Sequence, residues 1–316
     1  MSKSQKVAAF FLLLLATVPA CGLGYFPAGA WGRPLAIRGR HVQPKPRASN
    51  EWAAGAPPDV SRLDPHTRDT LADWWLLDAQ KEHASIPAFA RLAWQLVALG
   101  APPELLERTY RAGMQEIRHA RRCYALVSAY RGEPVGVMPM PELADGDAET
   151  DVVKLAVESL VDGCLIEGVN ADAARLALTR ATDPSVRALL RIISVDEAQH
   201  AELAWAIVEW CVALGGEPVL DALRATLEAL PTEVGGMYSD ELATKVARCD
   251  IADLHAHGRV PLADWPALIQ QRRALVAERL DSTYQRDSAI VSVARISASA
   301  LALTSSSTGL SQPLSV

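Results

Sequence analysis

Residues 116–119 of this 316-residue chain read EIRH and residues 197–200 read EAQH, so the spacing Glu-x-x-His occurs twice. Positions i and i+3 lie about 60° apart around an α-helix, and the Glu and His of each motif therefore point to the same side. Both motifs interrupt stripes of apolar or small residues spaced three and four apart, which is the pattern of a helix face buried in a core. We expect both motifs to lie in the middle of long helices and to point inward.

A lone glutamate precedes each motif on a separate apolar helical pattern. Glu82 lies 34 residues before Glu116, and Glu167 lies 30 residues before Glu197. Four carboxylates in one apolar core would protonate or unfold it unless cations neutralised them. Two divalent ions balance four carboxylates, and oxygen and imidazole ligands suit iron or manganese. The sequence predicts a dinuclear metal centre with six ligands, namely Glu82, Glu116, His119, Glu167, Glu197 and His200.

These residues lie on four long helical patterns, at about 67–99, 104–130, 151–179 and 184–215. The first two and the last two patterns are joined by short links, which makes each pair an antiparallel hairpin. The middle link has about eighteen residues and is long enough to cross the length of a bundle. We expect an all-α protein, a ferritin-like four-helix bundle of two antiparallel hairpins with a long crossover, followed by a helical C-terminal extension.

The order of one Glu, one Glu-x-x-His, one Glu and one Glu-x-x-His on four helices resembles the ferritin-like di-iron carboxylate proteins, which include ferritins, rubrerythrins and bacterial di-iron hydroxylases. Residues 82–91, EHASIPAFAR, also look like a group of bacterial ferritin-like domain proteins. The resemblance covers about 145 residues, from Leu71 to Gly215. It implies a cofactor of two iron ions, with manganese or a mixed pair as alternatives, and O₂ or peroxide as a partner together with an unknown small molecule or reductant.

Two functions of different classes follow from this resemblance. The first is an oxidoreductase that uses O₂ or peroxide on an unknown substrate, and the second is a non-catalytic metal-binding or scaffold lipoprotein with a structural or degenerate site. The five cysteines include no Cys-x-x-Cys pair, which disfavours a self-contained rubrerythrin-like peroxidase. The net charge of −6 and the lack of a long basic run argue against a nucleic-acid partner.

Polar residues beside the expected ligands are candidates to accept hydrogen bonds from the histidine N–H groups. Ligating histidines usually donate their second ring N–H to a carboxylate, carbonyl or water, and such partners hold the ring in place. The candidates are Asp196, Asp162 and Gln199. No further catalytic residue is assigned.

The first twenty residues have the pattern of a signal peptide. Lys3 and Lys6 precede an apolar run from Val7 to Val18, and small residues lead to Cys21. The cysteine after a small residue resembles a bacterial lipobox, which implies lipidation of Cys21 and a membrane anchor in the cell envelope outside the cytoplasm. The alternative is a soluble secreted or periplasmic protein.

Composition divides the rest of the chain. Residues 21–66 are rich in Pro and Gly, and we expect a tether there. Residues 67–215 form the expected metal-binding bundle, residues 216–290 a helical C-terminal extension, and residues 291–316 a flexible tail.

Overall fold

The computed structural model describes residues 33–283 except 34, 39, 147–149 and 231–238. The expected signal peptide, the expected lipidation site Cys21 and the expected tail at 291–316 lie outside the described residues. The chain divides into two compact units, 1–274 and 275–316. Of the second unit, residues 275–283 are described and are helical.

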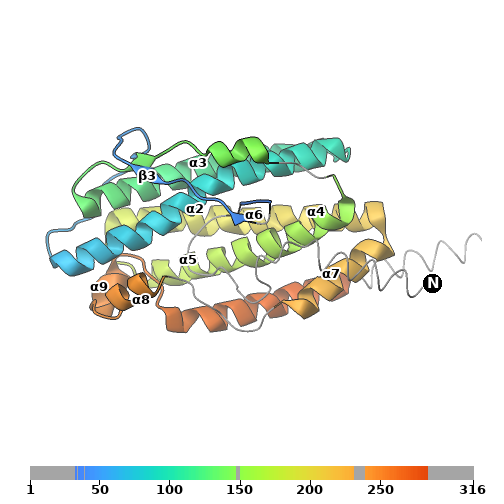
Figure 1. Ribbon diagram of the computed structural model, residues 1–316. Coiled ribbons are helices and arrows are strands. Elements are labelled where there is room, and N and C mark those ends of the chain that lie inside the picture. The colour runs from blue at the N-terminus through green and yellow to red at the C-terminus, as the bar shows by residue number, and fades with distance from the viewer. Residues whose placement is uncertain (1–32, 34, 39, 147–149, 231–238, 284–316) are drawn as a thin grey trace, which may run out of the picture. The chain divides into compact units, whose positions relative to one another are not determined.

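The first hairpin consists of α2 (Pro65–Ala98) and α3 (Pro103–Arg131), which pack along each other (Figure 1). α2 begins after Asp64, whose carboxylate accepts hydrogen bonds from the backbone N–H groups of His66 and Thr67. Such a cap satisfies donors that have no partner inside the helix. Gly100 and Gly132 follow the two helices with φ of +73° and +75°, a conformation that glycine adopts without strain.

The second hairpin consists of a long interrupted helix and α6 (Pro184–Gly215). The interruption is a change of helix type: α4 (Val152–Glu158) is followed directly by the π-helical η2 (Ser159–Glu167) and then by α5 (Gly168–Arg180). A π-helical turn is rare and often marks a functional position. α6 packs against this helix and against α3, so the two hairpins meet along α3 and α6.

Two short strand pairs involve the segment before the helices, and the second pair joins it to the link between α3 and α4. β1 (Ala36–Ile37) pairs with β2 (Arg40–His41), and β3 (Pro46–Arg47) pairs with β4 (Gly136–Val137), both antiparallel. In the second pair Pro46 is opposite Val137. β4 and the 3₁₀ helix η1 (Pro141–Asp145) both belong to the link between α3 and α4. Gln80 and Ser85 of α2 also donate hydrogen bonds to the carbonyls of Pro44 and Arg33, so part of the segment expected as a tether lies against α2.

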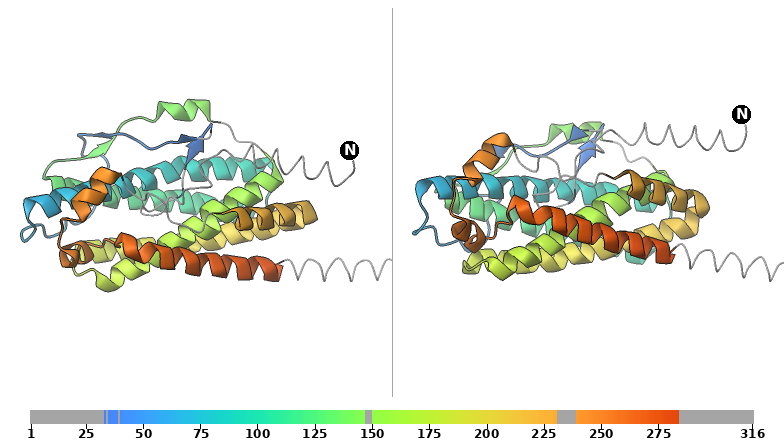
Figure 2. Two further views of the ribbon diagram at one scale, coloured as in Figure 1. Left: turned by 60° about the horizontal axis from the view of Figure 1, so that its bottom comes forward. Right: turned by 90° about the horizontal axis from the view of Figure 1, so that it is seen from below.

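The extension after α6 contains α7 (Glu217–Ala229), α8 (Asp240–Val246), α9 (Ile251–Ala256) and the 3₁₀ helix η3 (Leu262–Asp264). α7 packs on α4, and α8 packs on α2 (Figure 2). Just after α9, the guanidinium of Arg259 donates from both Nη atoms to Asp78 Oδ2 at 2.7 Å. This buried ion pair fixes the extension to the middle of α2.

The described residues are mostly helical, as expected for an all-α protein. Their largest fully buried side chains include Trp74, Trp75, Tyr124 and Phe89, so the core is well filled with aromatic residues. None of the helices within the described ranges combines the length and the apolar character that crossing a membrane requires.

Candidate metal centre

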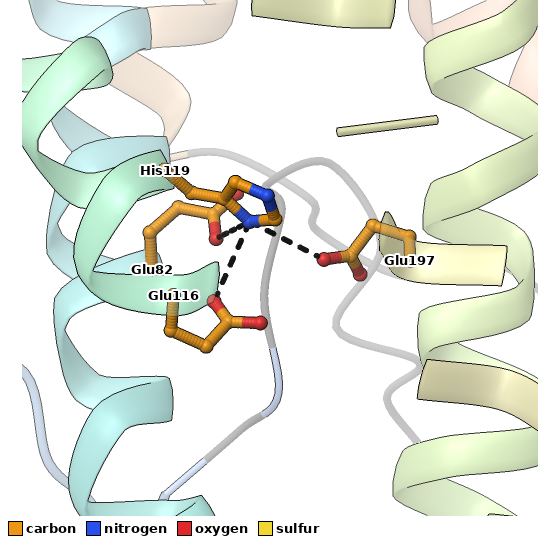
Figure 3. A group of neighbouring side chains, drawn as sticks. All are labelled: Glu82, Glu116, His119 and Glu197. Carbon is orange, nitrogen blue, oxygen red and sulfur yellow. Dashed lines mark hydrogen bonds and ion pairs between the residues drawn. The ribbon is translucent and has the colours of Figure 1, made fainter. Parts of the chain in front are cut away.

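Four buried side chains from three helices meet between the hairpins (Figure 3). Glu82 comes from α2, Glu116 and His119 from α3, and Glu197 from α6, and one potential ligand atom of each lies within 4.8 Å of the others. All four side chains are inaccessible to solvent. A buried group of three carboxylates and one imidazole could hold a metal ion.

His119 points its Nδ1 atom at the three carboxylates. This atom lies 3.2 Å from Glu82 Oε2, 3.8 Å from Glu116 Oε2 and 3.7 Å from Glu197 Oε1. The other ring nitrogen, Nε2, donates to Asp196 Oδ2 at 2.9 Å. An ionised carboxylate only accepts hydrogen bonds, so Asp196 places the proton of a neutral imidazole on Nε2. The lone pair of Nδ1 then faces the carboxylate group.

His200 has the same arrangement on the other motif. Its Nδ1 atom lies 3.1 Å from Glu116 Oε1 and 3.5 Å from Glu197 Oε1. Its Nε2 atom lies 2.9 Å from Gln115 Oε1. Because the amide of Gln115 donates its N–H to Asp196 Oδ1 at 2.8 Å, its oxygen is the atom left to accept from His200.

Asp196 and Gln115 thus cross-link the two motifs. Each residue directly precedes the glutamate of one motif and accepts the hydrogen bond of the histidine of the other. Gln199 accepts from the Gln115 amide at 3.2 Å, and Arg118 lies 3.1 Å from Asp196 Oδ2. Sequence reasoning did not single out Gln115, although its position before Glu116 matches that of Asp196 before Glu197.

Asp162, the third polar candidate, lies elsewhere. It is on η2, and no described contact joins it to either histidine. Burial raises the pKa of Asp162 to about 6, although Arg33 and Arg91 oppose this shift.

Glu167 is the last residue of η2 and interacts electrostatically with Glu116, Glu197 and His200. Its side chain is fully buried and forms an ion pair with Arg33, whose Nη1 lies 3.5 Å from Glu167 Oε2. Burial raises the pKa of Glu167 to about 8, and the positive charges of Arg33 and His200 limit the rise. Glu167 is not among the four residues whose ligand atoms lie within 4.8 Å of one another.

Burial and mutual electrostatic interactions shift the pKa values of the carboxylates and imidazoles in the centre. Burial and the charge of Glu116 raise the pKa of Glu82 well above its usual value. Burial also raises the pKa of Glu197, whereas the two imidazoles outweigh burial at Glu116 and hold its pKa below the usual range. Burial opposes charge on both imidazoles, yet the carboxylates around them raise the pKa of His119 well above its usual value and that of His200 to about 10. Protons therefore neutralise part of the cluster.

Several ligand atoms also lack hydrogen-bond partners among the described residues. These atoms are both carboxylate oxygens of Glu116, Glu167 and Glu197, together with Glu82 Oε1 and His200 Nδ1. A buried polar atom without a partner costs on the order of 1–3 kcal/mol. Cations that bind oxygen and imidazole would satisfy these atoms at once, so the residues present fit a metal centre.

An open pocket of about 590 Å³ reaches the outer side of the centre. It lies between α3, α5 and α6, and both Gln115 and His200 line it. Solvent and small solutes in the pocket can therefore reach Gln115 and His200, which lie next to the buried carboxylates. Three arginines also line the pocket, namely Arg108, Arg111 and Arg175.

Comparisons with protein-family models, with curated proteins and with solved structures found no match for this chain.

Proposed function

We propose that this chain is a ferritin-like carboxylate protein that binds two metal ions, iron or manganese, and uses O₂ or peroxide to oxidise a small molecule. The observation that carries the proposal is the pair of buried histidines. Each directs Nδ1 at buried carboxylates and donates a hydrogen bond from Nε2 to the residue that directly precedes the opposite motif.

The distances around His119, and the electrostatic interaction of Glu167 with His200, suggest which residues would hold which ion. His119 and Glu82 would hold one ion, and His200 and Glu167 the other. Glu116 offers one oxygen toward each histidine, Oε2 toward His119 and Oε1 toward His200. Glu197 Oε1 lies 3.7 Å from His119 Nδ1 and 3.5 Å from His200 Nδ1. These distances support the proposal that the two ions would share Glu116 and Glu197.

A bound iron or manganese pair supplies one-electron oxidation and reduction at each ion, which O₂ and peroxide chemistry requires. The chain's own residues prepare the site for it. Asp196 and Gln115 fix the ring orientation of the two histidines, so that each Nδ1 atom faces inward and would present its lone pair to a cation once its proton leaves. Burial of the carboxylates excludes bulk water, which strengthens their hold on a cation.

The test is to load metal-depleted protein with Fe(II) under argon and then admit O₂. The proposal expects about two Fe(II) bound per chain and an absorbance change that requires O₂. The variant Glu116→Ala with His119→Ala should lose both, while Glu107→Ala, which removes an exposed carboxylate from the same helix, should lose neither. Bound iron without any response to O₂ or peroxide would favour the alternative, a non-catalytic metal-binding or scaffold protein.

We also propose that lipid on Cys21 anchors the protein in the cell envelope. This proposal rests on the sequence pattern of residues 3–21. Replacing Cys21→Ala should move the protein from the membrane fraction to the soluble fraction. An unchanged membrane fraction would contradict the anchor.

A further inference from the structure

Arg33, which lies in the segment before the helices, reaches the candidate metal centre. Arg33 is only 5% exposed, and its Nη1 lies 3.5 Å from Glu167 Oε2. Its guanidinium carbon lies 5.5 Å from the centre of the Phe89 ring. A Cβ on Gly163 would lie 3.2 Å from Arg33 Nη1, a tight contact, so the guanidinium also lies against Gly163. The buried guanidinium thus contacts Glu167, the Phe89 ring and Gly163.

The backbone around Arg33 is held on α2 by contacts that do not involve the guanidinium. Ser85 Oγ donates to the Arg33 carbonyl at 2.9 Å, and Arg91 Nη1 donates to the Ala36 carbonyl at 2.7 Å. Leu35 packs with Ala84 and other apolar residues of the same cluster. A change of the Arg33 side chain alone should therefore leave this segment in place.

Arg33 makes the two halves of the centre electrostatically different. Glu82 contacts an imidazole, which becomes neutral when it loses its proton, whereas Glu167 contacts a guanidinium, which keeps its charge at all ordinary pH values. A cation that binds Glu167 must approach this fixed positive charge. Like charges repel strongly where water is excluded.

We propose that Arg33 competes with the second divalent cation for Glu167, so that the ion held by Glu167 and His200 binds more weakly than the ion held by Glu82 and His119. This inference rests on the proposed function, because it assumes two ions. It predicts ordered loading, with the four-residue group of Glu82, Glu116, His119 and Glu197 filled first.

The experiment is a titration of the metal-depleted protein with Co(II) at fixed pH. Calorimetry and the visible absorption of Co(II) both monitor binding during the titration. The wild type should bind in two separate steps. Arg33→Gln should tighten the second step by about tenfold or more, because the competing charge is gone, and should leave the first step unchanged. Arg33→Lys keeps the charge and should keep the two steps apart.

Arg91→Gln is the matched control. Arg91 holds the same segment through the Ala36 carbonyl, and its side chain does not contact Glu167. The Arg91→Gln protein should therefore still bind Co(II) in two separate steps. Circular dichroism shows whether each variant folds, and Arg33→Met replaces Arg33→Gln if the latter does not.

An Arg33→Gln protein whose second step is unchanged, weakened or lost would overturn the inference. Two equal steps in the wild type would overturn it as well. A wild type that binds no Co(II) in any step would instead contradict the proposed function on which it rests.

Discussion

His119 Nε2 on α3 donates a hydrogen bond to Asp196 Oδ2 on α6 at 2.9 Å, although His119 belongs to one Glu-x-x-His motif and Asp196 directly precedes the other. The reciprocal bond, from His200 to Gln115, has the same length. The two motifs therefore orient each other, and neither histidine can rotate without breaking a buried hydrogen bond. Loss of such a bond to a metal-ligating histidine typically weakens metal binding 10–100-fold.

Asp196→Ala is expected to weaken metal binding by about 10–100-fold, because His119 loses the partner that orients its ring. Asp196→Asn keeps an acceptor and should lose less. The measurement is a competition titration against a chelator of known affinity. Gln199→Ala serves as the control, since Gln199 touches only the Gln115 amide of this network, and its effect should be smaller. Equal losses in the two alanine variants would contradict the assignment.

Gly163→Ala is expected to destabilise the protein by about 1–3 kcal/mol, because the new methyl group would overlap the Cβ atom of Ala204 on α6. Gly113→Ala provides a matched comparison in α3, where the nearest atom, Phe89 Cβ, lies at an ordinary 3.5 Å. That change should be neutral or stabilise by about 0.5–1 kcal/mol. Urea unfolding of chelator-treated protein measures both, and the prediction fails if the two substitutions behave alike.

Arg259→Met is expected to cost about 3–5 kcal/mol of stability, because it leaves the carboxylate of Asp78 buried without its strongest partner. Both side chains are almost completely inaccessible, at 2% and 0% exposed. The double variant with Asp78→Leu removes the buried charge and should recover part of the loss. Urea unfolding measures both variants, and a double variant at least as unstable as Arg259→Met would contradict this explanation.

The metal-free protein is expected to lose stability as the pH rises from about 5 to 9. The pKa of Glu167 is raised to about 8 from 4.5 and that of His200 to about 10 from 6.5, so the folded state binds more protons than the unfolded state across this range. Stability from raised pKa values is present at low pH and lost at high pH.

Metal ions replace these protons, so the stabilisation that excess Mn(II) provides should grow over the same range. Thermal unfolding at several pH values, with chelator and with Mn(II), measures both trends. A melting temperature of the chelated protein that rises between pH 5 and 9 would contradict the prediction.

The sequence predicts the long helices because their apolar residues recur at helical spacing and their ends carry clear signals. Asp183-Pro184, for example, indicates the start of α6, and Asp183 does accept hydrogen bonds from the backbone of Ser185 and Val186. The inward direction of both Glu-x-x-His motifs follows from the same periodicity, and all their Glu and His side chains are buried.

Other features have no such signal. The π-helical stretch Ser159–Glu167 changes which residues face the core, yet its composition is that of an ordinary buried helix. Arg33 lies in a Pro-rich, aperiodic segment 134 residues before Glu167, and nothing in a local pattern indicates that contact. The role of Gln115 depends on the relative placement of α3 and α6, which a linear pattern does not encode.

The central claim is that six residues hold two metal ions between the hairpins. An anomalous difference map at the iron edge, from crystals of protein loaded with Fe(II) under argon, tests it most directly. The claim predicts two peaks about 3.5–4 Å apart, one next to His119 Nδ1 and the other next to His200 Nδ1. A single peak, or peaks away from these two nitrogen atoms, would contradict it.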